Sequence, residues 1–413
     1  MAVRDVGVRA ATVALIAAML TVACHAGVRQ PAAATRRNAS ARSGGGLTYQ
    51  DGVAGIAVTL DSFPIVAISD LHGVAELGVF RHRLLSDERV LDRIQDVVIE
   101  AGNSLYQPLA DRYVRGEPVP IDSLRLIWNN TTQSPLNTLD APLYAEDILG
   151  TVRSANATRR PDQRVRVLLA DPPLDWSVAR TRADVVRFLS QRRVSHVRVL
   201  SDSVLAKGHR ALFICGGLHL LRTTAGVTGN SPTATTVQRV LLAHPGSVYV
   251  VLVFDGFGGT TATYEPLMNV LPRESLVPFP GSVLAKLGAE EVMSATPGAP
   301  PGQALTFVPT PNGMSAMPNG PSIVAGLTLS DIADAYLYLR PFTELTLAIP
   351  DLSRYRRDPA LLAELDRRQR IMTGDPFDTA AFFAPTASTL IYGRSRGDRN
   401  VRRPPSVQPP RQQ

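Results

Sequence analysis

The chain has 413 residues, of which 45% are hydrophobic and 19% charged, and this composition excludes a generally disordered protein. The formal net charge is +7, but much of the basic excess gathers towards the two ends, so charge alone does not predict a nucleic-acid-binding surface. The length suffices for two average domains or for one large domain with additions.

The N-terminal residues 1–26 are predicted to be an export signal, because Arg4 and Arg9 precede a short apolar stretch. The residues before Cys24 resemble a bacterial lipobox, which predicts cleavage there and a lipid anchor on Cys24. Ordinary signal cleavage near Ala26 is the alternative. In both cases we expect an exported protein of the periplasm or cell envelope, and the lipid would attach it to a membrane.

Residues 27–46 are rich in Ala, Arg, Ser and Gly and are predicted to form a flexible linker. We expect a single domain over residues 47–390. The basic residues 391–413 are predicted to be a disordered tail.

Short apolar runs alternate with helix-like segments through the predicted domain. The runs lie at 65–68, 97–99, 165–170, 211–215, 247–254 and 334–339. Helical spacing marks 76–94, 180–205 and 236–243, and three further helices between 105 and 155 form an insertion. Residues 297–321 are predicted to be a long loop that is either a lid or disordered. The alternation predicts an α/β fold with a mostly parallel sheet and helices on both faces.

Polar side chains follow four successive apolar runs, at the point where each run ends. These residues are Asp70 with His72, then Glu100, Asp171 and His219. The carboxyl ends of parallel strands meet at one edge of a sheet, where open α/β folds bind their ligands. We therefore expect two histidines and three carboxylates to converge on one crevice.

Two mechanisms suit these residues. In the first, His72 or His219 takes a proton from water that attacks an ester or similar carbonyl, and Asp70 or Glu100 orients the imidazole. In the second, His72, His219, Asp70 and Glu100 supply the ligands of one divalent metal that activates water. In either case Arg222 and Asp171 are candidates for binding the substrate, a small molecule or a peptide.

The order of these motifs resembles the superfamily that joins erythromycin esterases, ChaN-like haem-uptake lipoproteins and Tiki/TraB proteins. The resemblance covers residues 63–222 and rests on Ser69 to His72, on Glu100, and on Gly216 to His219 followed by Arg222. Ser69 and Asp70 stand where the family has Gly and Glu, so this carboxylate is one methylene shorter. The resemblance implies an exported hydrolase, or alternatively a non-catalytic lipoprotein that binds haem or another ligand.

Two further readings concern cofactors. Tyr106, Tyr113 and Tyr144 are candidates for an axial haem ligand in the binding alternative. Residues 68–73 also resemble the opening motif of calcineurin-like metallophosphoesterases, but the motifs that complete their two-metal site do not occur. Whether the protein is an enzyme, and whether it uses a metal, haem or neither, is therefore left open by the sequence.

Overall fold

The computed structural model describes residues 41–42, 46–71, 73–134, 145–229, 231, 233–253, 266–289, 305–310, 313–318, 323–341, 344–346, 348 and 352–383. These residues belong to one compact unit, Ala39–Gln413. Cys24, His72 and Tyr144, the export signal and the C-terminal tail lie outside the described residues, and so does most of the linker. The predictions for them, and the domain limits, stay predictions.

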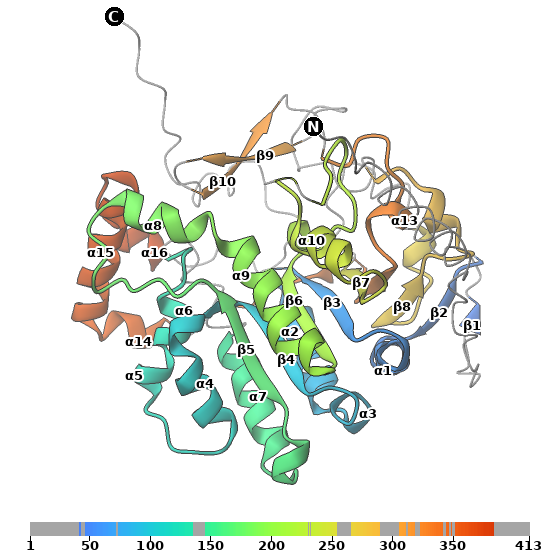
Figure 1. The fold of residues 1–413 in the computed structure, drawn as a ribbon, viewed down its shortest axis with the longest axis horizontal. Helices are drawn as coiled ribbons and strands as arrows, with labels where there is room; N and C mark the ends of the chain where they lie inside the picture. The colour runs from blue at the N-terminus through green and yellow to red at the C-terminus, as the bar shows by residue number, and fades with distance from the viewer. Residues whose placement is uncertain are drawn as a thin grey trace, which may run out of the picture. The chain divides into compact units, whose positions relative to one another are not determined.

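The protein has an α/β fold with a nine-stranded, mostly parallel sheet among its described residues, as predicted (Figure 1). The order across the sheet is β1 (Ala41–Arg42), β2 (Thr48–Asp51), β8 (Ser275–Pro278), β11 (Ala335–Tyr338), β7 (Val248–Val253), β3 (Ile65–Asp70), β6 (Ala211–Gly216), β4 (Asp96–Asn103) and β5 (Arg166–Asp171). The six strands from β11 to β5 run parallel, whereas β1, β2 and β8 pair antiparallel at the other side.

Each of the six apolar runs forms a strand of the sheet. Their residues are apolar without alternation because both faces of the sheet are covered. In β3, Val66 and Ile68 pack into the core on one face, and Ile65 and Ala67 pack into the core on the other. Two hydrophobic cores therefore hold the strands in place from opposite sides.

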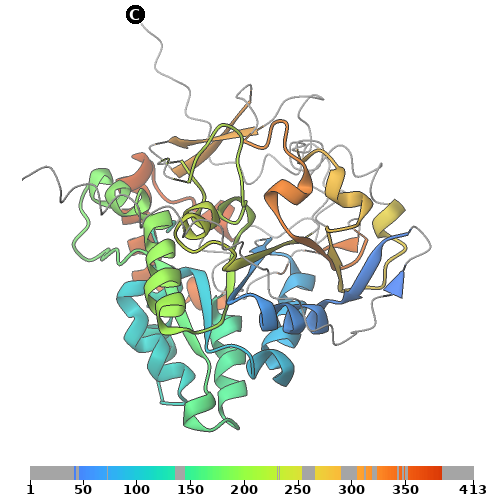
Figure 2. The same ribbon diagram turned by 45° about the vertical axis from the view of Figure 1, so that its right-hand side comes forward.

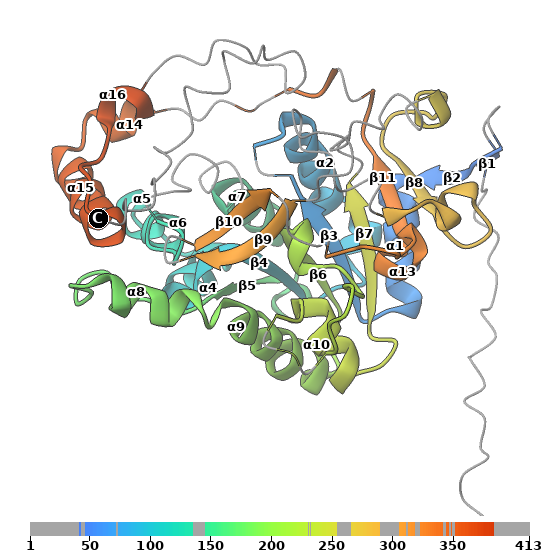
Figure 3. The ribbon, with the colours of Figure 1, turned by 90° about the horizontal axis from the view of Figure 1, so that it is seen from above.

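Helices cover both faces, and Figure 3 shows α2 and α7 on one side of the strands and α9 and α10 on the other. The first core includes α1 (Gly52–Ser62), α2 (Ala75–Ser86), α3 (Glu88–Leu91), α4 (Gln107–Val114), α5 (Ile121–Leu124), α6 (Leu126–Asn129) and α7 (Asp147–Asn156). The second side carries α9 (Arg192–Arg198), α10 (Thr236–Ala243) and α13 (Leu329–Ile332). The helical insertion predicted between β4 and β5 is thus formed by α4 to α7.

Several elements differ from the sequence-based expectation. The predicted helix 76–94 is divided at Asp87, which caps α3, and 180–205 is divided into α8 (Arg182–Leu189), α9 and a π-helical turn, Val199–Val204. The predicted loop 297–321 contains an antiparallel pair, β9 (Leu305–Thr310) and β10 (Gly313–Pro318). Backbone pairing stabilises this pair although Pro and Gly are frequent there.

A C-terminal group of helices was not predicted. It consists of α14 (Ser353–Arg356), α15 (Pro359–Thr373) and α16 (Thr379–Phe382). Figures 1 and 2 both show this red group beside the green α8. Buried Leu174, Trp176 and Val185 pack with Met372 of α15 and form a third, smaller core. Within the described residues, no helix is both long and apolar enough to span a membrane.

Candidate functional site

The carboxyl ends of β3, β4, β5 and β6 lie at one edge of the sheet, because these four strands are parallel. Asp70 of β3 lies opposite Gly216 of β6, and Asn103 of β4 lies opposite Asp171 of β5. Asp70 and Asp171 are the last residues of their strands, whereas Glu100 lies within β4, which continues to Asn103 beyond the predicted run 97–99.

Glu100 is a buried carboxylate of this edge. Its side chain is 3% exposed, and Arg192 Nη2 donates to its Oε1 at 2.5 Å. The backbone N–H of Gly216 donates to Oε2, also at 2.5 Å. The pairing of β4 with β5 shifts register just after Ile99, so β4 bulges where Glu100 leaves the ladder. Both oxygens of Glu100 are thus fixed by charge-assisted or backbone hydrogen bonds.

Asp171 shares Arg192 with Glu100. Arg192 Nε donates to Asp171 Oδ1 at 3.1 Å, and Thr132 donates its backbone N–H at 2.6 Å and its hydroxyl at 2.8 Å. Asp171 is fully buried, and this burial raises its pKa to about 6, although Arg192 and Thr132 both favour the carboxylate. Asp171 therefore supports Arg192 from a position without access to solvent.

The raised pKa of Asp171 has a measurable consequence for stability. Because the folded protein holds this proton up to about pH 6, against an ordinary value of 3.8, its contribution is complete below pH 4 and is lost as pH rises through 6. We expect the unfolding free energy of the wild type, relative to Asp171→Asn, to fall by up to roughly 3 kcal/mol between pH 4 and pH 8. Urea unfolding at several pH values measures it. A difference that stays constant with pH would contradict the assignment.

His219 is the exposed member of this group. It lies in a short 3₁₀ turn, Gly217–His219, directly after β6, and its side chain is 17% exposed. Its Nε2 lies 3.5 Å from Oε1 of Glu100. The structure thus brings a partly exposed imidazole, whose Nδ1 is buried, to a carboxylate that accepts from Arg192 and from the Gly216 N–H.

Asp70 lies at the same edge and is paired with a different arginine. Arg81 of α2 donates to Asp70 Oδ1, and both side chains are almost completely buried. Ser69, the residue before it, accepts a hydrogen bond from the backbone of Val253 and so ties β3 to β7.

Arg81 and Arg192 were not among the sequence-predicted site residues. Each lies on a helix: Arg81 comes 11 residues after Asp70, whereas Arg192 is 92 residues from Glu100. Nothing in the spacing of charged residues relates Arg192 to Glu100 before the fold is known. For Arg81, its place among the apolar residues of α2 was an available signal.

Arg222 is not joined to this group. It forms an ion pair with Asp334, the residue before β11, and its backbone N–H donates to Ile332. Asp334 in turn accepts from the backbone N–H of Val250 in β7. Arg222 therefore ties the loop after β6 to β7 and to the start of β11.

The described carboxylates do not suit a divalent metal. Asp70 and Glu100 already accept from guanidinium groups, and a nearby Arg⁺ repels a second cation. Within the ranges that the structure describes, no group of three His, Cys, Asp or Glu side chains has the arrangement of a metal site. The arginine pairing counts against a cation at these two carboxylates, in the single-ion as in the metallophosphoesterase hypothesis. His72, another predicted ligand, lies outside the described residues.

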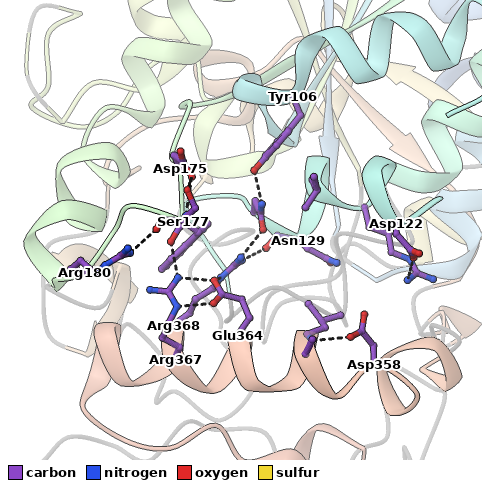
Figure 4. A pocket seen from close by; sticks show the side chains of 16 residues that line it. Tyr106, Asp122, Asn129, Asp175, Ser177, Arg180, Asp358, Glu364, Arg367 and Arg368 are labelled. Carbon is purple, nitrogen blue, oxygen red and sulfur yellow. Dashed lines mark hydrogen bonds and ion pairs between the residues drawn. The ribbon is translucent and has the colours of Figure 1, made fainter. Parts of the chain in front are cut away.

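A separate pocket lies between the helical insertion, the segment after β5, and α15 (Figure 4). Its volume is about 630 Å³, and Tyr106 is among its lining residues. Arg368 of α15 is buried there and donates to the backbone oxygen of Asn129 and to Oδ1 of Asn130. None of the predicted catalytic, substrate-binding or metal residues lines this pocket.

Comparisons with known proteins identify no relative by sequence: no protein-family model matches the chain, and no curated protein matches it. Solved structures with a partly similar backbone include a succinoglycan biosynthesis protein, with a TM-score of 0.41 and 10% sequence identity. That alignment covers 70% of this chain and 90% of the other. A Bacillus cereus protein gives TM-score 0.40 and 11% identity over 70% of this chain and 91% of its own. ChaN of Campylobacter jejuni, described with cofacial haem binding, gives TM-score 0.30 and 12% identity over 48% and 85%.

Proposed function

We propose that this chain is an exported hydrolase that cleaves an ester or amide-type bond at the carboxyl edge of its sheet. One observation carries the proposal: the partly exposed His219 lies 3.5 Å from Glu100, whose two oxygens are held by Arg192 and by the Gly216 N–H. A carboxylate held beside an imidazole is the pair that general base catalysis uses. Because Nε2 faces Glu100, the base is Nδ1, which is buried in this structure, so the proposal requires the attacking water to reach Nδ1.

In the proposed reaction, His219 takes a proton from water as the water oxygen bonds to the carbonyl carbon. The carbonyl π electrons move onto oxygen, and the tetrahedral intermediate then collapses. The bond to the leaving alcohol or amine breaks, and the imidazolium returns its proton to that group. Glu100 stabilises the imidazolium, while Arg192 and the Gly216 N–H hold its two oxygens in place.

Membership of the erythromycin esterase, ChaN-like and Tiki/TraB superfamily is part of the proposal. It is supported by the order of Asp70, His72, Glu100 and His219 in the sequence and by the common edge of the sheet at which Asp70, Glu100 and His219 lie. The proposed lipid anchor on Cys24, and with it the cell-envelope location, is supported by the N-terminal sequence.

A ligand-binding protein without catalysis is the second candidate, and the pocket beside α15 favours it. The hydroxyl of Tyr106 lines this pocket and lies 2.6 Å from Nδ2 of Asn130. The volume of about 630 Å³ falls within the range of small-molecule sites. Eight of the lining side chains are charged, which suits a polar ligand better than the apolar face of haem.

The test is a panel of model esters, lactones, amides and peptides offered to the wild type and to His219→Ala, with haemin titrated into both. We expect turnover by the wild type and at least a 100-fold loss in the variant, with both proteins folded by circular dichroism. Equal turnover in the two proteins would refute the assignment of His219. A Soret band that Tyr106→Phe removes, without turnover of any substrate, would establish the second candidate instead.

A further inference from the structure

A second histidine, His196, packs against the ring of His219. His196 of α9 is completely buried, and its ring meets the ring of His219 edge to face, with centroids 5.4 Å apart and planes at 81°. Its ring also meets Phe213 of β6 at 6.0 Å. Such edge-to-face contacts between rings are specific in direction, so they restrain orientation as well as position.

His196 is itself fixed from the far side. Its Nδ1 lies 3.3 Å from the hydroxyl of Thr236, the first residue of α10, and Thr236 is also completely buried. The capping box of α10, formed by Thr235 and Gln238, fixes the helix start that carries Thr236. Neither ring can therefore shift alone without moving a well-anchored helix end.

The helix that carries His196, α9, also carries Arg192, the arginine that binds Glu100. Arg192 and His196 are four residues apart on α9, so they lie on one face of the helix, one turn from each other. Arg192 binds Glu100, Glu100 faces His219, and His219 meets His196, which closes a ring of contacts that returns to α9. One short helix thus sets the imidazole and the carboxylate relative to each other.

We propose that His196 is a positioning residue that holds the His219 ring against Glu100. This inference rests on the proposed function of His219. Its environment keeps His196 in one charge state: burial lowers its pKa well below the ordinary value, and the nearby His219 and Arg192 lower it further. A neutral ring presents the same edge at every pH at which His219 exchanges protons, and it does not repel the imidazolium.

Two substitutions, each made in the full chain, distinguish the effect of the aromatic ring of His196 from the effect of the volume that the ring fills. His196→Phe keeps an aromatic ring, whereas His196→Leu fills the site without one, and both lose the contact with Thr236. We expect kcat of the Phe variant within about threefold of the wild type. The Leu variant should lose at least tenfold in kcat with KM unchanged.

The second readout is the imidazole NMR signal of His219, assigned with His219→Ala. A single sharp signal is expected in the wild type and in His196→Phe, and a broadened or split one in His196→Leu. This signal needs no substrate. If the His219 signal is split in His196→Leu but the wild type turns over no substrate, the proposed function is refuted and the positioning role stands.

Three outcomes would overturn the inference. A Leu variant with wild-type turnover and one sharp His219 signal would show that the ring is dispensable. Equal losses in the Phe and Leu variants, with one sharp signal in each, would show that the ring edge is not what matters. If His196→Leu does not fold, Thr236→Val takes its place, since it frees Nδ1 of His196 at constant volume. An unchanged kcat and His219 signal there would count against the proposal.

Discussion

Replacing Glu100 by Gln is expected to lower kcat/KM on the best ester or amide substrate at least 100-fold while the protein stays folded. Gln keeps the shape of the side chain but removes the charge that stabilises the imidazolium of His219, 3.5 Å away. Since that charge matters only after His219 has taken a proton, the loss should appear mainly in kcat. Steady-state kinetics of the purified variant measure it.

Glu117→Gln is the matched control. Glu117 also accepts from arginines, Arg112 and Arg115, but on the exposed surface after α4. This control should leave kcat and KM unchanged. If Glu100→Gln retained most of the wild-type kcat, Glu100 would not be the partner of the reacting imidazole.

Replacing Arg192 by Met is expected to lower the free energy of unfolding by about 3 to 5 kcal/mol. Met keeps most of the aliphatic volume but leaves Glu100 and Asp171 buried without their common cation. The loss should be largest above about pH 6, because Asp171 takes up a proton below that pH and needs the cation less. Urea unfolding on both sides of pH 6 measures both effects.

Arg112→Met provides the comparison for this second prediction. The ion pair between Arg112 and Glu117 is exposed, with side chains 47% and 42% accessible, and solvent screens it. We expect its loss to lower the free energy of unfolding far less than the loss of Arg192 does. Equal costs for the two arginines would mean that the buried charges at the sheet edge are not coupled to stability.

Much of the fold could be predicted because the parallel strands have a recognisable local sequence pattern. A strand covered on both faces must be continuously apolar, and the runs at 65–68, 97–99 and 211–215 could be recognised on that ground. The short antiparallel strands β2 and β8 were missed. Their residues, Thr48–Asp51 and Ser275–Pro278, mix polar and apolar side chains because they lie towards one side of the sheet.

The candidate site could be predicted only where it follows from strand order. Asp70 and Asp171 directly end strands, so the parallel sheet alone places them at one edge. Glu100 lies within β4, which continues to Asn103 beyond the predicted run 97–99. The arginines that pair with these carboxylates lie on helices. No regular spacing in the sequence links Arg81 or Arg192 to its partner. His196 shows the same limit, because its proposed role depends on the contact with His219, which joins α9 to the turn after β6.

Arg222 shows that a short distance in sequence does not predict which residues meet. It comes three residues after His219, but it forms its ion pair with Asp334, and its role in binding substrate stays a prediction. Proximity in sequence carries over to proximity in space along a helix or strand. It does not carry over through a loop, and the ion pair with Asp334 explains the arginine structurally.

The most direct test of the account is kcat/KM of the double variant Glu100→Gln, His219→Ala, measured beside both single variants on one substrate. If the two side chains act as a unit, removing the imidazole already removes everything that Glu100 contributes. The double variant should then be no slower than His219→Ala, within about threefold. Losses that multiply in the double variant would contradict the account, because they would show that Glu100 and His219 act independently.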